Sequence, residues 1–229
     1  MNKEGIVKIA KIVQALTYWP IYGSLRIFTK YTVEGQENLK GLESQGVLFA
    51  SNHTSYVDGP ICAASMPRRS FYPKEFFPIR FLAWKKFFKW FNPFLPPLSF
   101  FVAAYVRYNG SVPVERAGGD LLRALRYAIE ALKTGDKLWI YPEGRITKDG
   151  KLQQGKRGVV FLHQQTKAPI VPVALIGTHK TFRFPKIFST LLRRNKITVR
   201  LGKPIYDLGN VSLEEGTEKI MKSIGELMV

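Results

Sequence analysis

The chain has 229 residues, of which 45% are hydrophobic, and it contains 16 Phe, 10 Tyr and 4 Trp. This composition supports a packed core and excludes an intrinsically disordered chain, and the length suits one large α/β domain better than two small ones. The 35 Lys and Arg residues outnumber the 17 Asp and Glu residues and give a formal net charge of +18. This charge predicts an anionic partner: nucleic acid, anionic lipid or a phosphorylated substrate.

Cysteine and histidine usage narrows the chemistry. The single cysteine, Cys62, excludes an internal disulfide and fits a reducing, cytosolic setting. The three histidines, His53, His163 and His179, show no metal-ligand spacing, so we expect no metal. No segment has the pattern of a secretory signal, and no apolar run is long enough to predict a transmembrane helix.

Residues 1–32 are predicted to form a separate N-terminal element, a helical hairpin broken at Trp19–Pro20. Apolar residues recur at helical spacing in its first part: Ile6, Ile9, Ala10, Val13 and Leu16. Tyr18 and Tyr22 cluster near the expected bend. Amphipathic helices with basic edges and interfacial aromatic residues can lie in a membrane surface, so we expect this element to contact a membrane. The alternative is a hairpin packed on the core.

Residues 33–229 are predicted to form an α/β domain with a mixed, mainly parallel central sheet flanked by helices. Short apolar strands are expected at 47–50, 138–141, 170–175 and 197–201. One helix should begin after Asp120 and end before Gly135, and another should cover about 155–166. Ser212 and Glu215 form the pattern of a capping box at the start of the last helix.

Residues 71–101 are rich in Phe and Trp, with lysines interleaved and several prolines that prevent one long helix. Such a segment is able to stack on single-stranded nucleic acid, anchor in lipid headgroups or line an acyl-chain groove. It is also consistent with a core insertion that has a solvated basic face. Residues 180–203 contain eight basic residues and no acidic one, which predicts a second anion-facing patch.

The sequence from Asn52 to Gly59 directly follows the first expected strand and contains His53 and Asp58. On one continuous helix these two side chains would point about 140° apart. They can meet only if His53 lies in the turn and Asp58 in the first helical turn. Asp58 would then fix the imidazole tautomer and leave the other ring nitrogen as a general base. The alternative is a structural histidine bonded to a helix-capping aspartate.

A second polar motif, residues 141–147, follows the second expected strand and contains Glu143, Gly144 and Arg145. This position, at the carboxyl end of a strand, is where α/β folds bind ligands. Arg145 is suited to grip a phosphate, and Glu143 to fix that arginine or a substrate hydroxyl. The alternative is a surface turn with an ion pair. Residues 110–116 supply another arginine, and 168–173 form a strand entry bracketed by prolines.

In this order, the four features resemble the sequence blocks of the glycerolipid acyltransferase family, which includes 1-acyl-glycerol-3-phosphate acyltransferases and lysophospholipid acyltransferases. The turn from His53 to Asp58 matches the family's HxxxxD signature, and residues 110–116 match its GxxxVxR-like block. Residues 141–145 resemble its [FY]PEG block, and 170–173 resemble its IVPV block. The resemblance covers roughly residues 35–205.

The resemblance implies transfer of a fatty acyl group from acyl-CoA or acyl-ACP to a lysophospholipid hydroxyl, most simply that of 1-acyl-sn-glycerol-3-phosphate, with no other cofactor. It implies that His53 is the base, that Asp58 orients it, and that no acyl-enzyme forms. It also implies a peripheral or monotopic protein at the cytoplasmic face of an anionic membrane. Four residues are expected to bind the phosphate and glycerol of the acceptor: Arg116, Glu143, Gly144 and Arg145. Their position suggests that Lys156 and Arg157 also belong to the phosphate site.

One departure leaves the acceptor open. Arg145 follows Gly144 directly, giving PEGRIT where the family's commonest block reads PEGTR. This variant resembles the branch that acts on 2-acyl-glycerophosphoethanolamine. A non-catalytic basic protein that binds membrane or nucleic acid would not need the His53–Asp58 pair, and no nucleic-acid motif is present, so we expect no nucleic-acid partner. Nothing in the sequence positions Cys62 as a covalent nucleophile.

Overall fold

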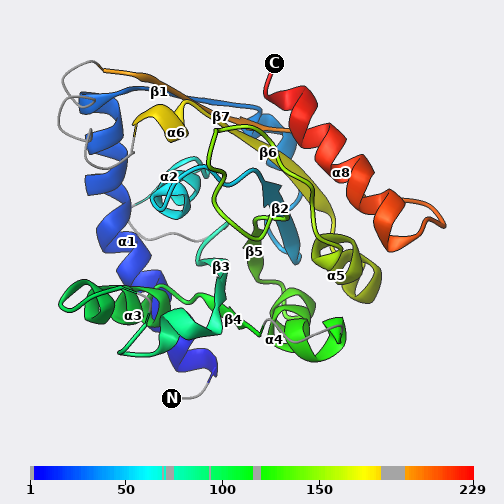
Figure 1. Cartoon of the computed structure of the whole chain (residues 1–229), viewed down its shortest axis with the longest axis horizontal. Helices are drawn as coiled ribbons and strands as arrows, with labels where there is room; N and C mark the ends of the chain where they lie inside the picture. The colour runs from blue at the N-terminus through cyan, green and yellow to red at the C-terminus, as the bar shows by residue number, and fades with distance from the viewer. Residues whose placement is uncertain (1–2, 69, 71–74, 93, 116–119, 182–193) are drawn as a thin grey trace.

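The computed structural model describes residues 3–68, 70, 75–92, 94–115, 120–181 and 194–229. Figure 1 shows helices on both sides of a twisted sheet. In chain order the elements are α1 Lys3–Phe28, β1 Lys30–Glu34, the 3-10 helix η1 Gln36–Leu39, β2 Val47–Ser51, α2 Asp58–Ala64, β3 Ile79–Trp84, the 3-10 helix η2 Lys85–Phe88, α3 Leu98–Tyr108, β4 Val112–Val114, α4 Leu121–Lys133, β5 Lys137–Ile140, α5 Gly158–Thr166, β6 Ile170–Ile176, α6 Thr178–Thr181, β7 Lys196–Leu201 and α8 Leu213–Leu227.

The strands in the described part of the chain form one seven-stranded sheet in the order β1-β7-β6-β2-β5-β3-β4. All neighbouring pairs are parallel except β6 and β7, so β7 and β1 run against the other strands. The prediction of a mixed, mainly parallel sheet flanked by helices is confirmed. Because β6, β2 and β5 are adjacent and parallel, their carboxyl ends meet at one edge of the sheet.

The alternation of side chains along β2 creates two cores. Val47 and Phe49 point into a cluster that includes residues of α1 and α2, and the ring of Phe49 stacks on Trp139 with centroids 5.0 Å apart. Leu48 and Ala50 point into the opposite cluster, which includes residues of α4, α5 and α8. All five residues of β2 are buried. This strand therefore lies between two hydrophobic layers, as central parallel strands do.

The elements predicted from local signals are confirmed. β2, β5, β6 and β7 coincide with the expected strands to within one residue at each end, and α5 occupies the expected helical segment. The side chain of Asp120 caps α4 by accepting from the backbone N–H of Arg123. Ser212 and Glu215 form the complete capping box at the start of α8. These signals are reliable because each cap depends on residues only three positions apart.

The predicted N-terminal hairpin is wrong, because α1 is a single helix that continues through Pro20. Pro20 has no backbone N–H, so the carbonyl of Leu16 lacks its usual helical partner. Both residues are exposed, so this carbonyl lies on the side of the helix that faces water. The opposite side of the helix is fixed to the core. There the Tyr18 hydroxyl lies 3.4 and 3.3 Å from the carbonyl oxygens of Ala64 and Met66. The boundary predicted between residues 32 and 33 falls within β1.

The aromatic-rich segment contributes to the fold as β3, η2 and the start of α3, none of which was predicted. β3 pairs with β5 and β4, and its first residues are buried. Gln14 of α1 anchors this strand, since its amide accepts from the backbone N–H of Ile79 and donates to the carbonyl of the same residue. The same amide also donates to the carbonyl of Asn109, at the end of α3. The segment is therefore partly core and partly surface.

Gly177, between β6 and α6, is expected to tolerate no side chain. Its φ is +87°, and a Cβ would lie 2.1 Å from the carbonyl oxygen of Lys196 in β7. We expect Gly177→Ala to lower the free energy of unfolding by about 2–4 kcal/mol, because the backbone strain adds to the clash. Urea denaturation of both proteins at one pH measures this difference.

Gly41 is a matched control. Its φ is +86°, but nothing lies within 4 Å of a Cβ at this position. Gly41→Ala should therefore lower stability only through backbone strain, by about 1 kcal/mol. Equal losses in the two variants would show that the approach of β7 to Gly177 is not a tight constraint.

Candidate active site

Three chain segments meet at the carboxyl edge of the sheet. His53 follows β2 after one residue, Tyr141 follows β5 and Thr178 follows β6. The hydroxyl groups of Thr54 and Thr178 are hydrogen-bonded to each other, which joins the first and third segments. The parallel order β6-β2-β5 thus brings together the motifs that the sequence separates by about ninety residues.

Asn52 fixes the direction in which the chain leaves β2. Its side-chain amide donates to the carbonyl of Leu175 over 2.9 Å and accepts from the backbone N–H of the same residue over 2.7 Å. The amide is buried, and these two bonds replace the backbone pairing that ends where β2 stops. His53 consequently begins its turn from a rigid position.

The His53 ring and the Asp58 carboxylate meet as the sequence predicted. Nδ1 of His53 lies 2.9 Å from Oδ2 of Asp58, which is the first residue of α2 and is fully buried. The same oxygen accepts from the backbone N–H groups of Thr54 at 2.6 Å and Ser55 at 2.8 Å. Three donors therefore converge on one carboxylate oxygen.

This geometry determines the histidine tautomer. Because backbone N–H groups only donate, the Asp58 oxygen is an acceptor, and Nδ1 of His53 carries the proton that it donates. The lone pair is then on Nε2, which has no hydrogen-bond partner within the described segments. The His53 side chain is 20% exposed, so Nε2 is within reach of a substrate. The arrangement is suited to general-base catalysis.

Glu143 joins the second motif to the first. Its Oε1 accepts from the backbone N–H of His53 at 2.8 Å, and its Oε2 accepts from the backbone N–H of Gln153 at 3.1 Å. A further bond runs from the N–H of Thr147 to the carbonyl of His53 over 2.8 Å. Burial raises the pKa of Glu143, while the two N–H donors act in the opposite direction. Glu143 therefore positions the backbone of His53, and it does not fix Arg145 as one sequence interpretation proposed.

Arg145 and Lys156 place two exposed cations beside Gly144. Nε of Arg145 donates to the side chain of Gln153 over 2.6 Å. The Lys156 side chain crosses Gly144 so closely that a Cβ on the glycine would lie 2.9 Å from its Nζ. The φ of Gly144 is +66°, a backbone conformation that favours glycine at this position. The two cations can bind an anionic group next to the His53–Glu143 contact.

The other predicted binding residues are Arg116 and Arg157. Arg116 is outside the described residues. Arg157 pairs with Glu214 of α8 over 3.0 Å, so its guanidinium is directed toward that helix. No group of three or more His, Cys, Asp or Glu side chains able to hold a metal ion occurs within the described residues.

The contact between Tyr141 and His53 was not predicted from the sequence. The Tyr141 ring stacks on His53 with centroids 4.0 Å apart and planes 15° apart. Behind it the Cys62 thiol lies 3.8 Å from the Tyr141 hydroxyl. Burial raises the pKa of both groups well above their usual ranges. Cys62 is therefore a neutral thiol that supports Tyr141, and the structure gives it no nucleophilic character.

The sequence profile of the family described as Acyltransferase matches residues 30–176, which is more than half of the chain and includes every residue of the His53–Glu143 site. The chain belongs to the acyltransferase family. A chloroplastic 1-acyl-sn-glycerol-3-phosphate acyltransferase of Arabidopsis thaliana is 28% identical over 218 residues, covering 94% of this chain and 53% of the relative. The chain thus spans about half the length of this curated relative.

Two further comparisons agree in the fold and family. A 1-acyl-sn-glycerol-3-phosphate acyltransferase of Bacillus subtilis is 26% identical over 215 residues, covering 90% of this chain and 88% of the relative. The crystal structure of the 1-acyl-sn-glycerophosphate acyltransferase PlsC of Thermotoga maritima superposes with a TM-score of 0.62 at 23% identity, covering 97% of this chain and 77% of that chain. At this identity the structural match shows that the two share a fold.

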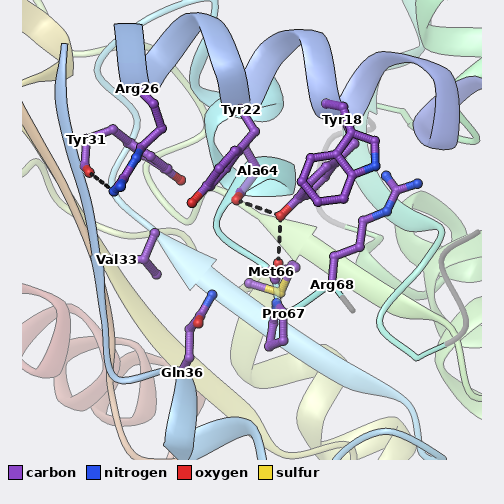
Figure 2. A pocket seen from close by; sticks show the side chains of 11 residues that line it. Tyr18, Tyr22, Arg26, Tyr31, Val33, Gln36, Ala64, Met66, Pro67 and Arg68 are labelled. Atoms are coloured by element: carbon purple, nitrogen blue, oxygen red, sulfur yellow. Dashed lines mark hydrogen bonds between the residues drawn. The ribbon is translucent and has the colours of Figure 1, made fainter. Parts of the chain in front are cut away.

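The acyltransferase also has a pocket of about 300 Å³ between α1, β1, η1 and the end of α2 (Figure 2). Tyr18, Tyr22 and Tyr31 line it, with Arg26 on one side and Arg68 on the other. The Arg68 guanidinium lies 4.5 Å from the centroid of the Tyr18 ring, so it is stacked on the aromatic wall. None of the residues lining this pocket belongs to the His53–Asp58 turn or to the 141–145 segment.

Tyr141 is expected to contribute through its ring and not through its hydroxyl. We expect Tyr141→Phe to retain kcat/KM for acyl transfer within about threefold, because the stack on His53 remains. Tyr141→Ala removes that support and should lower kcat/KM by about 10–100-fold, since a catalytic group displaced by 1 Å can lose that much. Steady-state kinetics on both variants test this, and equal losses would assign the role to the hydroxyl.

Proposed function

We propose that this acyltransferase transfers a fatty acyl group from a thioester donor to the hydroxyl group of a lysophospholipid, with 1-acyl-sn-glycerol-3-phosphate as the acceptor. The observation that carries the proposal is the His53–Asp58 pair, in which a fully buried carboxylate bonds Nδ1 and leaves Nε2 free toward solvent. The names of the Arabidopsis thaliana and Bacillus subtilis relatives support the same acceptor.

The residues of the site support direct transfer. Nε2 of His53 takes the proton of the acceptor hydroxyl as that oxygen attacks the thioester carbonyl carbon. Asp58 stabilises the imidazolium that forms, because its carboxylate already accepts from Nδ1. When the carbon–sulfur bond breaks, the proton on Nε2 passes to the departing thiolate. No protein nucleophile is needed, which agrees with the neutral, buried state of Cys62.

Arg145 and Lys156 are suited to bind the phosphate of the acceptor. Both are exposed, and they flank Gly144, whose neighbour Glu143 contacts the backbone of His53. A phosphate bound there would place the glycerol hydroxyl of the same molecule near the imidazole. Arg116, which the family resemblance also implicates, stays a predicted member of this site.

Two aspects of specificity are part of the proposal. The donor is acyl-CoA or acyl-ACP, and no further cofactor is required. The direct Gly144–Arg145 sequence favours 2-acyl-glycerophosphoethanolamine as the second candidate acceptor, because it departs from the commonest family block.

We further propose that the enzyme is peripheral, at the cytoplasmic face of an anionic membrane, which attracts its net charge of +18. None of the helices in the described residues is both long and apolar enough to span a bilayer.

An acyl-transfer assay tests the proposal. Radiolabelled palmitoyl-CoA and palmitoyl-ACP are each offered with glycerol 3-phosphate, lysophosphatidic acid, lysophosphatidylethanolamine or lysophosphatidylglycerol. We expect the wild-type protein to acylate lysophosphatidic acid most rapidly. We expect His53→Ala to lower kcat by about 10²–10⁴-fold, the usual contribution of a positioned general base.

Circular dichroism and the thermal midpoint establish whether the His53→Ala variant is folded. Product formation by a folded His53→Ala variant at the wild-type rate would exclude His53 as the base. Transfer to lysophosphatidylethanolamine alone would replace the first acceptor with the second. Lipid binding by the wild type without product from any donor and acceptor would favour a non-catalytic role.

The phosphate assignment predicts a different kinetic change. We expect Arg145→Ala to raise the KM for lysophosphatidic acid with little effect on the KM for the donor. The loss in kcat/KM should be about 10–100-fold, as for one charged hydrogen bond. Arg157→Ala is the matched control, because that arginine is also exposed but is paired with Glu214. A change confined to the donor KM would contradict a phosphate role for Arg145.

A further inference from the structure

Helix α3 turns its large apolar side chains away from the core. Its buried side carries the smaller residues Ser99, Ala103 and Val106. The exposed side chains are bulky and recur at helical spacing: Leu98, Phe101, Tyr105 and Tyr108. A helix packed against a core in water normally has the opposite arrangement. The exposed side of α3 therefore has the character of a surface that is covered in use.

The loop before α3 extends this apolar surface. Phe91 is 80% exposed and Leu95 is 84% exposed. The Phe100 ring of α3 lies 6.0 Å from the ring of Phe91 and 6.2 Å from that of Trp90, so the loop and the helix form one surface. We name it the aromatic face and define it by its exposed side chains: Trp90, Phe91, Leu95, Leu98, Phe100, Phe101, Tyr105 and Tyr108.

Positive charge accompanies the aromatic face. Residues 76–114 contain no Asp or Glu and five basic residues. Arg80 is buried and pairs with Asp136, and Lys85 pairs with Glu115, which leaves Lys86, Lys89 and Arg107 as the cations of this surface. The Arg107 guanidinium lies 4.6 Å from the centroid of Trp90, and the Lys86 ammonium lies 4.6 Å from that of Trp84. Lys86 and Lys89 are exposed. Aromatic and aliphatic groups edged by cations match the acyl chains and anionic headgroups of a lipid surface.

The aromatic face connects directly with the catalytic turn. Tyr56, which lies between His53 and Asp58 in the chain, is 77% exposed, and its ring centroid is 5.8 Å from that of Phe94. Phe94 in turn stacks on Phe87 of η2 at 5.9 Å. The loop that carries Phe91 and Leu95 therefore also contacts the turn that contains His53.

We infer that the aromatic face docks the enzyme on an anionic lipid bilayer, with α3 lying in the plane of the headgroups. The lysophospholipid acceptor then passes from the bilayer, along Tyr56, to His53. This inference rests on the proposed function in one respect, that the acceptor is a bilayer lipid. It assigns membrane docking to η2, the following loop and α3, whereas the sequence pattern assigned it to the N-terminal element.

The composition of the face favours lipid over other occupants. Leu95 and Leu98 are among its exposed members, and aliphatic side chains provide no stacking surface for nucleobases. Protein interfaces are depleted in lysine, whereas Lys85, Lys86 and Lys89 occur here within five consecutive residues. Lys85 pairs with Glu115, and anionic headgroups complement the exposed Lys86 and Lys89.

Vesicle co-sedimentation tests the docking surface. The wild type is compared with Phe91→Ser/Phe101→Ser on vesicles of phosphatidylcholine with about one third phosphatidylglycerol, and on pure phosphatidylcholine. We expect the double variant to bind the anionic vesicles at least about tenfold more weakly, since two large apolar side chains no longer enter the interface. A triple variant, Lys85→Gln/Lys86→Gln/Lys89→Gln, should lose the preference for anionic over neutral vesicles.

Two matched double variants serve as comparisons. Leu122→Ser/Tyr206→Ser removes two exposed apolar side chains far from this segment in sequence, and it should bind like the wild type. Ile12→Ser/Leu16→Ser removes two of the exposed apolar side chains of α1. Loss of binding in the α1 variant with undiminished binding in Phe91→Ser/Phe101→Ser would overturn the inference in favour of α1. A wild-type dimer that Phe91→Ser/Phe101→Ser converts to monomer without weaker vesicle binding would overturn it in favour of a second copy of the chain.

An activity measurement separates this inference from the proposed function. With a short-chain acceptor that is monomeric in solution, such as 1-hexanoyl-sn-glycerol-3-phosphate, Phe91→Ser/Phe101→Ser should equal the wild type, whereas its rate on acceptor embedded in vesicles should fall with its binding. Equal loss on both acceptors would show that the face belongs to the active site itself. If the wild type acylates neither acceptor, the proposed function fails, while co-sedimentation still reports on docking.

Discussion

The burial of the Asp58 carboxylate is the constraint around which the site is arranged. A carboxylate with no exposed surface is stable in a protein only when hydrogen-bond donors surround it. Here Oδ2 of Asp58 accepts hydrogen bonds from Nδ1 of His53 and from two backbone N–H groups. Two of the three donors belong to the main chain, so the turn cannot change conformation without leaving the charge unpaired. The position and tautomer of the imidazole therefore follow from the need to pair this buried carboxylate in the folded state. The proposed general base would use the same geometry.

The parallel sheet supplies the remaining supports of the turn from residues distant in sequence. Asn52 bonds Leu175 of β6 on one side, and Glu143, following β5, accepts from the N–H of His53 on the other. Tyr141 covers the face of the ring. The supports lie at the carboxyl ends of β2, β5 and β6, because these neighbouring parallel strands end at the same edge. The same edge leaves Arg145 exposed two residues after Glu143, so the proposed anion-binding group and the proposed general base are held by one set of strands.

Much of this arrangement was predictable wherever the signal was local. The HxxxxD spacing predicted the meeting of His53 and Asp58, because a histidine in the turn and an aspartate in the first helical turn are the conformations that allow it. The stack of Tyr141 on His53 was not predictable, since it depends on the order of β2 and β5 in the sheet. The prediction of an N-terminal hairpin was wrong because Pro20 lies on the exposed side of α1 and does not end that helix. β3 and α3 were missed because both lie in one aromatic-rich stretch whose bulky residues are not confined to the buried side of each element.

The His53–Asp58 turn lies between a cationic segment and an apolar surface, and the proposed substrate accounts for both. An acceptor lipid has an anionic headgroup and an apolar chain, so a site that acts at the junction of the two needs cations on one side and apolar surface on the other. Arg145 lies on the Glu143 side of His53, and Phe94 contacts the turn through Tyr56. Helix α3 keeps its bulky side chains in water when the protein is free, an arrangement that a core would not select. An aromatic surface whose loop contacts the turn of a buried carboxylate is therefore consistent with the proposed reaction at the boundary between a bilayer and water.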